Sequence, residues 1–150
     1  MKTLIWTPHT TVAAVIEREG RFLLIEEHTS DGLKLNQPAG HLDEHETLVD
    51  ACAREALEEA AVHFRPQSLV GVYQWRAPSN GVTYLRFAFA GELLGHEPGR
   101  ALDAGIVRSL WLSADEIERS AHRQRSPLVW ACVSDYLAGK RFALDLIRHF

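Results

Sequence analysis

Between residues 40 and 62 the chain reads GHLDEHETLVDACAREALEEAAV. Within this segment Glu55, Glu58 and Glu59 are spaced so that, on a helix turning about 100° per residue, they share roughly 100° of the surface. Carboxylates on one arc repel each other unless a cation lies among them, and Arg54 supplies only one positive charge. The spacing therefore predicts a helix that holds a divalent cation, and all-oxygen ligands favour Mg²⁺, with Mn²⁺ as a substitute.

The other side of this helix is predicted to be apolar. We expect the helix to begin between His45 and Thr47 and to run to about Ala60. Its apolar positions recur at helical spacing opposite the carboxylates, at Val49, Ala53, Ala56, Leu57 and Ala60. This pattern predicts a helix that packs one face on a sheet and presents its acidic residues on the other face.

The same segment resembles the Nudix box, G-x5-E-x7-R-E-U-x-E-E-x-G-U, where U is a bulky aliphatic residue. The matching positions are Gly40, Glu46, Arg54, Glu55, Glu58, Glu59 and Val62. Two positions depart from the pattern, because Ala56 is small and Ala61 replaces the second glycine. A glycine there commonly ends the helix with a positive φ, and alanine in that conformation costs about 1 kcal/mol. We expect the site to tolerate this strain.

The resemblance implies a Nudix-type α/β/α sandwich with a mixed sheet, and an Mg²⁺-dependent hydrolase that cleaves a diphosphate linked to another group. It implies that the metal ligands are Glu55, Glu58, Glu59 and the backbone carbonyl of Ala39. The catalytic set that it implies is Glu55, Glu58, Glu59, Arg54 and Glu46. In this set Arg54 orients a glutamate through its guanidinium group and Glu46 pairs with Arg54. One of the three glutamates, or a carboxylate from elsewhere, serves as the general base.

Three shorter segments are similar to the NudJ-type phosphatase branch of this family, namely Pro38–Leu42, Tyr73–Pro78 and Arg125–Leu128. That likeness implies nucleoside tri- and diphosphates, hydroxymethylpyrimidine diphosphate or thiamine diphosphate as substrates, with release of orthophosphate. Two alternatives remain open. One is a Nudix pyrophosphatase for ADP-ribose or a dinucleoside polyphosphate, and the other is a non-catalytic nucleotide-sensing Nudix domain. The intact set of glutamates weighs against the second alternative.

The composition is that of a globular protein. A chain of 150 residues with 46% hydrophobic and 24% charged residues suits one domain, residues 1–150, of the α/β or α+β class. The formal net charge of −4 weighs against nucleic acid and membrane surfaces as partners. With two cysteines, no signal-peptide pattern and no membrane-length apolar run, we expect a cytoplasmic protein. We expect it to be a monomer or small homo-oligomer whose partner is a small-molecule diphosphate.

The rest of the chain predicts strands and two further helices. The predicted strands are 10–16 and 21–27, forming one hairpin, 69–75 and 82–90, forming a second, and 106–112. Segments 28–39, 63–68 and 91–105 read as loops. A capping box of Ser113 and Glu116 predicts a short helix. A second helix is expected to follow Ser126-Pro127 and to end near Gly139.

Substrate-binding candidates lie outside the central segment. Tyr73 and Trp75, with Tyr84, could stack on a planar heterocycle, although packing in the core or at its rim is an equal alternative. Lys34 and Arg86 could bind phosphate, as could Arg76 and Arg125, although exposed basic residues often have no specific role. Many Nudix enzymes recruit a further acidic residue from a loop, and Glu97 and Asp103 are the candidates here.

Overall fold

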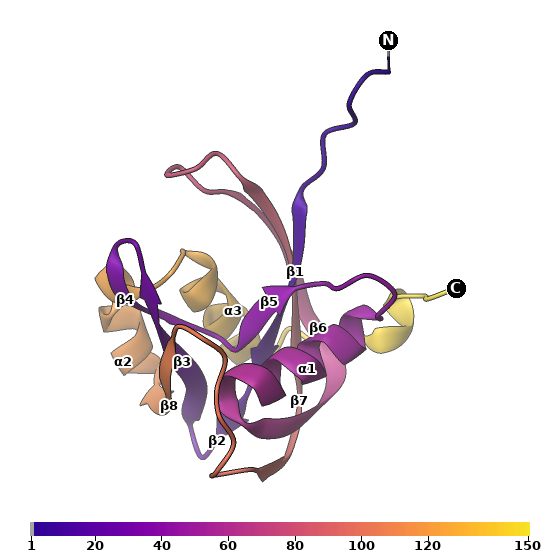
Figure 1. Cartoon of the computed structure of the whole chain (residues 1–150). Helices are drawn as coiled ribbons and strands as arrows, with labels where there is room; N and C mark the ends of the chain where they lie inside the picture. Colours follow the sequence, from indigo (N-terminus) through magenta and orange to yellow (C-terminus); the bar gives the residue numbers. More distant parts are fainter. Residues whose placement is uncertain (1) are drawn as a thin grey trace.

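Figure 1 shows the computed structural model, which describes residues 2–150. Its strands are β1 His9–Val15, β2 Glu17–Arg18, β3 Arg21–Thr29, β4 Gly32–Asn36, β5 Ala39–His41, β6 Val62–Arg76, β7 Thr83–His96, β8 Ile106–Ser113 and β9 Phe142–Ala143. Its helices are α1 Leu48–Ala60, α2 Ala114–Arg119 and α3 Leu128–Leu137, with short 3-10 turns at Ala121–Arg123 and Leu144–Leu146. Within residues 2–150, none of the helices combines the length and the apolar character needed to cross a membrane.

The strands form two sheets. The first has the order β5-β1-β7-β6-β9 and is mixed, because β1 and β7 run parallel while the other pairs are antiparallel. In the second sheet β3 lies between β4 and β8, and β2 also pairs with β3, all antiparallel. The predicted α/β class with a mixed sheet is confirmed.

Successive residues of β1 and β3 point into two different cores, as expected for strands covered on both faces. One core joins Val12, Ala14 and Ile16 to α1, and the other joins Ala13 and Val15 to α2 and α3. Helix α1 therefore lies on one side of the sheets and α2 and α3 on the other (Figure 1).

The predicted hairpin of residues 10–16 and 21–27 is wrong except at its tip. Only β2 and the start of β3 pair there, at Glu17 with Phe22 and Arg18 with Arg21. The flanking strands separate into the two sheets, where β1 lies between β5 and β7 and β3 lies between β4 and β8. The continuous apolar runs thus reflect strands that are buried on both faces, and they do not indicate which strands pair.

Two of the three predicted loops are largely strands, and the third is so in part. Segment 28–39 contains the end of β3 and all of β4, and 63–68 belongs to β6. Segment 91–105 begins with the last six residues of β7. Strand β6 accommodates Pro66 because its pairing with β7 shifts register between Pro66 and Ser68. Gly91 lies opposite, where a Cβ atom would be 2.0 Å from the carbonyl oxygen of Arg65. The actual loop before β8 is therefore only residues 97–105.

The predicted capping box of α2 and the glycine after α3 are found in the structure, α1 is capped by Thr47, and α3 begins after Pro127 without a side-chain cap. Thr47 accepts a hydrogen bond from the backbone N–H of Asp50 at the start of α1. The capping box between Ser113 and Glu116 is formed in both directions. Gly139, just beyond α3, has a φ of 81°. These local contacts satisfy backbone groups at the helix ends, as such capping signals commonly do.

Helix α1 ends on Ala61, which adopts the left-handed conformation with φ 55° and ψ 34°. Replacing Ala61 by glycine should relieve this strain while loosening the unfolded chain. We therefore expect the free energy of unfolding to rise by no more than about 1 kcal/mol in a urea titration. We expect kcat to stay unchanged, because no side chain is required at this position. An increase in kcat of orders of magnitude would contradict this expectation.

Candidate active site

Arg54 lies at the centre of a group of carboxylates on and before α1. It holds Glu46 with two hydrogen bonds, Nη2 to Oε1 at 2.7 Å and Nε to Oε2 at 3.0 Å. Its Nη1 donates to Glu55 at 2.8 Å and to Glu58 at 3.1 Å, and Nη2 lies 3.4 Å from Asp43. The structure therefore brings together Arg54, Glu46, Glu55 and Glu58, all predicted as catalytic residues.

These contacts shift the ionisation of the groups in opposite directions. The hydrogen bond from Arg54 holds the pKa of Glu46 below its usual value, and Glu46 in turn raises the pKa of Arg54. Burial raises the pKa of Glu55, although Arg54 opposes the shift. Arg54 thus favours the ionised form of Glu46. At Glu55 its hydrogen bond does not offset the effect of burial on the pKa.

Three carboxylates form a compact cluster that could hold a metal ion. Oxygen atoms of Glu55, Glu58 and Asp103 all lie within 4.8 Å of one another. The loop carrying Asp103 is fixed to α1, because its backbone N–H donates to the carbonyl of Glu58 at 3.0 Å. Of the two loop acids considered, Glu97 instead pairs with His63 at 3.1 Å and Arg100 at 3.4 Å.

The donor set fits a hard divalent cation, because all three cluster members offer carboxylate oxygens. Gly40 on β5 leaves the space that the carboxylate of Glu55 occupies. A Cβ atom at this position would lie 2.1 Å from Oε1 of Glu55, so any other residue would displace that carboxylate. The glycine of the sequence pattern therefore has a steric reason in this structure.

Glu59 lies apart from this cluster and is fixed to β5. Its Oε1 accepts a hydrogen bond of 2.8 Å from the backbone N–H of Ala39. Because the N–H and C=O of a strand residue point to the same edge, the carbonyl of Ala39 faces α1 as well. Burial raises the pKa of Glu59 to about 8, reinforced by the charges of Glu55, Glu27 and Asp103 and opposed by the Ala39 hydrogen bond.

This shift predicts a pH dependence for the metal-free protein. The pKa of Glu59 rises from 4.5 to about 8 on folding, so the folded state binds its proton more tightly than the unfolded chain. The stability contributed by that proton is complete below pH 4.5 and is lost as the pH rises to about 8. We expect a loss on the order of a few kcal/mol, measured by urea unfolding in EDTA.

The control for this prediction is Glu59→Gln, which cannot ionise. Its unfolding free energy should vary less with pH than that of the wild type over the same range. Identical pH profiles for the two proteins would contradict the assignment to Glu59.

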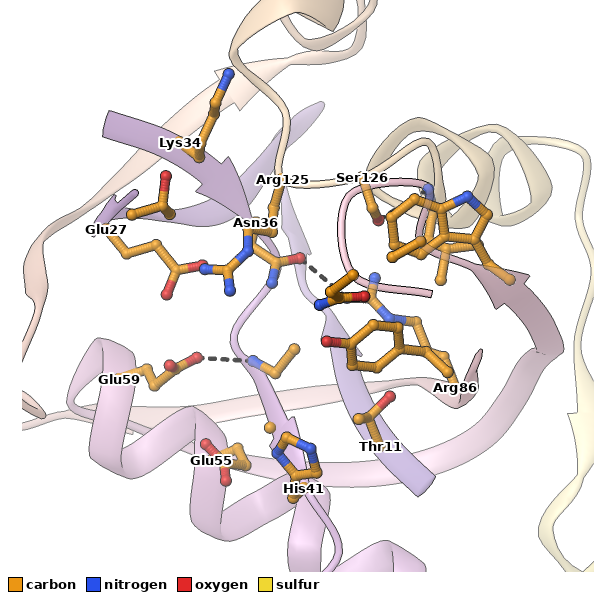
Figure 2. A pocket seen from close by; sticks show the side chains of 18 of the residues that line it. Thr11, Glu27, Lys34, Asn36, His41, Glu55, Glu59, Arg86, Arg125 and Ser126 are labelled. Atoms are coloured by element: carbon orange, nitrogen blue, oxygen red, sulfur yellow. Dashed lines mark hydrogen bonds and ion pairs between the residues drawn. The ribbon is translucent and has the colours of Figure 1, made fainter. Parts of the chain in front are cut away.

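A cavity of about 580 Å³ opens beside the carboxylates (Figure 2). Glu55 and Glu59 line one end of it, together with Gly40 and Ala39. Its other lining residues include the predicted binding residues Trp75, Arg86 and Lys34, and also Tyr84 and Arg125. The Trp75 and Tyr84 rings stack with centroids 6.0 Å apart and an interplanar angle of 23°. The cavity therefore combines acidic, basic and aromatic surfaces.

Arg86 forms part of the floor of the cavity and is only 5% exposed. It donates to Asn36 at 3.0 Å and to Gln37 at 2.9 Å. Gln37 in turn donates to the carbonyl of Val129 in α3 at 2.8 Å. The guanidinium group thus connects β7 with the last residue of β4 and with Gln37, which follows it. Through Gln37 it is also connected to α3.

The remaining candidates differ in position. Lys34 lines the cavity and donates to the carbonyl of His122 at 3.0 Å. Tyr73 is not among the lining residues. It packs in the core beneath α3, donates its hydroxyl hydrogen to Asp135 at 2.7 Å, and has a pKa raised by burial. The structure does not bring Tyr73 together with Trp75 at the cavity.

The sequence did not single out Glu27 and Asn36, which also line the cavity. Glu27 lies near the end of β3, and Asn36 ends β4 inside a segment predicted as a loop. Alternation of side chains along a β3–β4 hairpin could have predicted which face of the sheet carries Glu27 and Asn36. The signal is weak, because this part of the hairpin is short and polar.

Comparisons with known proteins agree with this geometry. Residues 7–131 match the NUDIX domain model. The chain is 42% identical to Phosphatase NudJ of Escherichia coli (strain K12) over 146 residues, covering 97% of this chain and 94% of that protein, and equally so to its counterpart in Shigella boydii.

Solved structures show the same relationship. A NUDIX hydrolase from Nitrosomonas europaea superposes with a TM-score of 0.94 at 49% identity, covering 96% of this chain and 98% of that one. A MutT NUDIX hydrolase from Burkholderia pseudomallei has the same fold, with a TM-score of 0.73 at 20% identity and coverage of 87% and 98%. The predicted Nudix-type sandwich is confirmed. This chain belongs to the Nudix family and is a hydrolase that acts on diphosphate bonds.

Proposed function

We propose that residues 1–150 form a single-domain, Mg²⁺-dependent hydrolase of small planar molecules that carry a diphosphate, and that it releases orthophosphate. Its proposed substrates are nucleoside tri- and diphosphates, hydroxymethylpyrimidine diphosphate and thiamine diphosphate. The observation that carries this proposal is the cavity in which acidic residues of α1 face basic side chains and the Trp75–Tyr84 ring pair. The name phosphatase, borne by relatives that are 42% identical, supports orthophosphate as the product.

The reaction has an electrostatic problem, because a nucleophile must approach a group that carries several negative charges. A bound divalent cation neutralises phosphate oxygens and lowers the pKa of coordinated water. The residues proposed to hold it are Glu55, Glu58 and Asp103, with Glu59 and the carbonyl of Ala39 as further candidates. Oxygen ligands of this kind favour Mg²⁺, with Mn²⁺ as a substitute.

The side chains around the proposed metal site have separate tasks. Arg54 keeps Glu55 and Glu58 in place through its two hydrogen bonds from Nη1. Glu46 fixes the opposite edge of that guanidinium group. Glu55 and Glu59 line the cavity and are the candidates for accepting a proton from the attacking water, because both carboxylates face the space where a substrate would lie.

The opposite part of the cavity is proposed to bind the organic group. Trp75 and Tyr84 offer ring surfaces against which a pyrimidine or purine can pack. Arg86 and Asn36 supply polar atoms at the floor, and Lys34 retains N–H groups for a phosphate. All the proposed substrates share a planar ring and a diphosphate. This surface is therefore proposed to bind that class of molecule without distinguishing one substrate from another.

A product screen with Mg²⁺ tests the proposal. Purified protein is incubated with nucleoside tri- and diphosphates, thiamine diphosphate, hydroxymethylpyrimidine diphosphate, ADP-ribose and a dinucleoside polyphosphate. Orthophosphate and pyrophosphate are quantified separately. We expect orthophosphate from members of the first three groups. Turnover confined to ADP-ribose or the dinucleoside polyphosphate would replace this proposal with that specificity, and no turnover of any compound would leave a nucleotide-sensing domain as the alternative.

A further inference from the structure

Three lysine and arginine side chains of the described chain line the cavity, and they differ in how fully they are engaged. Arg86 is buried and both of its terminal nitrogens bond to Asn36 or Gln37. Lys34 donates to the carbonyl of His122. Arg125 makes one side-chain hydrogen bond, from Nη1 to Oε1 of Glu27 at 2.7 Å. A guanidinium group has five N–H donors, so Arg125 has the largest unused capacity.

The backbone that carries Arg125 is held firmly against β4. The N–H of Arg125 donates to the carbonyl of Leu35 at 2.8 Å, and Gln124 forms a parallel bridge with the same residue. Two residues earlier, Arg123 forms an ion pair with the buried carboxylate of Glu26. The Cα atom of Arg125 is therefore fixed, while its side chain is 47% exposed and free to meet a ligand.

Glu27 determines which way the guanidinium group faces. Its side chain is 16% exposed and lies near the end of β3. Figure 2 shows Glu27 and Arg125 together, across the cavity from Glu59 and Glu55. The N–H groups of a guanidinium point in different directions within one plane, so one edge can hold a carboxylate while another binds a phosphate. The Glu27 contact thus directs the free edge without occupying it.

We infer that Arg125 binds a substrate phosphate on the side of the cavity opposite α1, and that Glu27 is the residue that positions it. This inference rests on the proposed function, since it requires a phosphorylated substrate in this cavity. A phosphate placed there would lie between the cation that the acidic cluster is proposed to hold and the guanidinium group of Arg125. Arg125 then neutralises charge that the carboxylates of α1 cannot.

Substitutions at the pair test the inference through KM and kcat. Removing a charge-assisted hydrogen bond in Arg125→Ala should raise KM about 10- to 100-fold. The turnover number kcat should change far less, because the contact exists before and during the reaction. Arg125→Lys should recover part of the affinity, since lysine restores the charge without the planar fork. Glu27→Gln should raise KM less than Arg125→Ala does. The double variant should have the same KM as Arg125→Ala alone, because Glu27 acts only through Arg125.

The matched control is Arg119→Ala, which removes an equal charge from an exposed arginine of α2 outside the cavity lining. Its KM should equal that of the wild type. Thermal melts establish that each variant is folded, and Arg125→Lys carries the test should Arg125→Ala not fold. A KM of Arg125→Ala equal to that of Arg119→Ala and the wild type would overturn the inference and leave the proposed function intact. If Arg125→Ala does not fold, a KM of Arg125→Lys equal to both would do the same.

A binding measurement separates failure of the inference from failure of the proposed function. Methylenediphosphonate, a diphosphate analogue that cannot be hydrolysed, is titrated with Mg²⁺ into the wild type and the same variants by calorimetry. We expect its Kd to increase about 10- to 100-fold in Arg125→Ala and to stay unchanged in Arg119→Ala. This outcome would support the phosphate contact even if no compound in the product screen were turned over. Equal affinities in all proteins would overturn it.

Discussion

Replacing Glu55 with glutamine should lower kcat by about 10³-fold while the protein becomes no less stable without metal. Glutamine preserves the shape of the side chain but removes the negative charge from the cluster with Glu58 and Asp103. Burial already raises the pKa of Glu55, so its charge is unfavourable to the metal-free fold and its removal should not reduce the melting temperature. Kinetics with Mg²⁺ and melting in EDTA measure the two effects.

Glu44→Gln provides the control, since Glu44 lies in the same segment but is exposed, and its one salt-bridge partner within residues 2–150 is the exposed side chain of His45. We expect this variant to match the wild type in both measurements. A Glu55→Gln protein that retained a kcat close to the wild-type value would show that this carboxylate is not needed for the reaction.

Arg54→Ala should have the largest effect on stability. It leaves Glu46, Glu55 and Glu58 without the guanidinium group that holds them at 2.7, 2.8 and 3.1 Å. Breaking a buried ion pair costs about 3–5 kcal/mol, and the partial exposure of Arg54 reduces this to about 2–4 kcal/mol. Urea unfolding in EDTA measures the loss. We also expect kcat to fall, because Glu55 and Glu58 lose their orientation.

Added Mg²⁺ should stabilise Arg54→Ala more than it stabilises the wild type, because a cation replaces part of the missing positive charge. Arg54→Lys should be intermediate in stability, since lysine cannot bond to three carboxylates in one plane. Arg100→Ala, which removes a surface contact with Glu97, is the control. A stability of Arg54→Ala equal to that of Arg100→Ala would contradict the central position of Arg54.

The parts of the fold that were predictable depend on contacts close in sequence. Helix α1 and its acidic residues follow from helical spacing, and its start follows from the Thr47 cap. Its buried surface was less predictable. Ala51 and Cys52 are fully buried although neither belongs to the predicted apolar face, and Glu55 and Glu59 are largely buried although they belong to the predicted acidic face. The helix contacts β1, β5 and β6 together, so its buried surface is wider than one stripe.

Features that depend on distant residues were not predictable. The segments that contain Pro66 and Gly91 were predicted to be loops. In the structure these two residues pair with each other beside a β-bulge, and β6 and β7 continue through both positions. Asp103 could not be distinguished from Glu97 until the loop was seen to bond to the carbonyl of Glu58. Tyr73 and Trp75 lie on the same face of β6, but α3 covers only the former. Each outcome was decided by a tertiary contact that the local pattern does not encode.

The central claim is that Glu55, Glu58 and Asp103 hold the cation on which hydrolysis depends. The most direct measurement is orthophosphate release as a function of Mg²⁺ concentration for the wild type and Asp103→Asn. We expect no release in EDTA, recovery with Mg²⁺, and a half-maximal Mg²⁺ concentration at least about tenfold higher in Asp103→Asn. Full activity in EDTA, or the same Mg²⁺ dependence in both proteins, would contradict the claim.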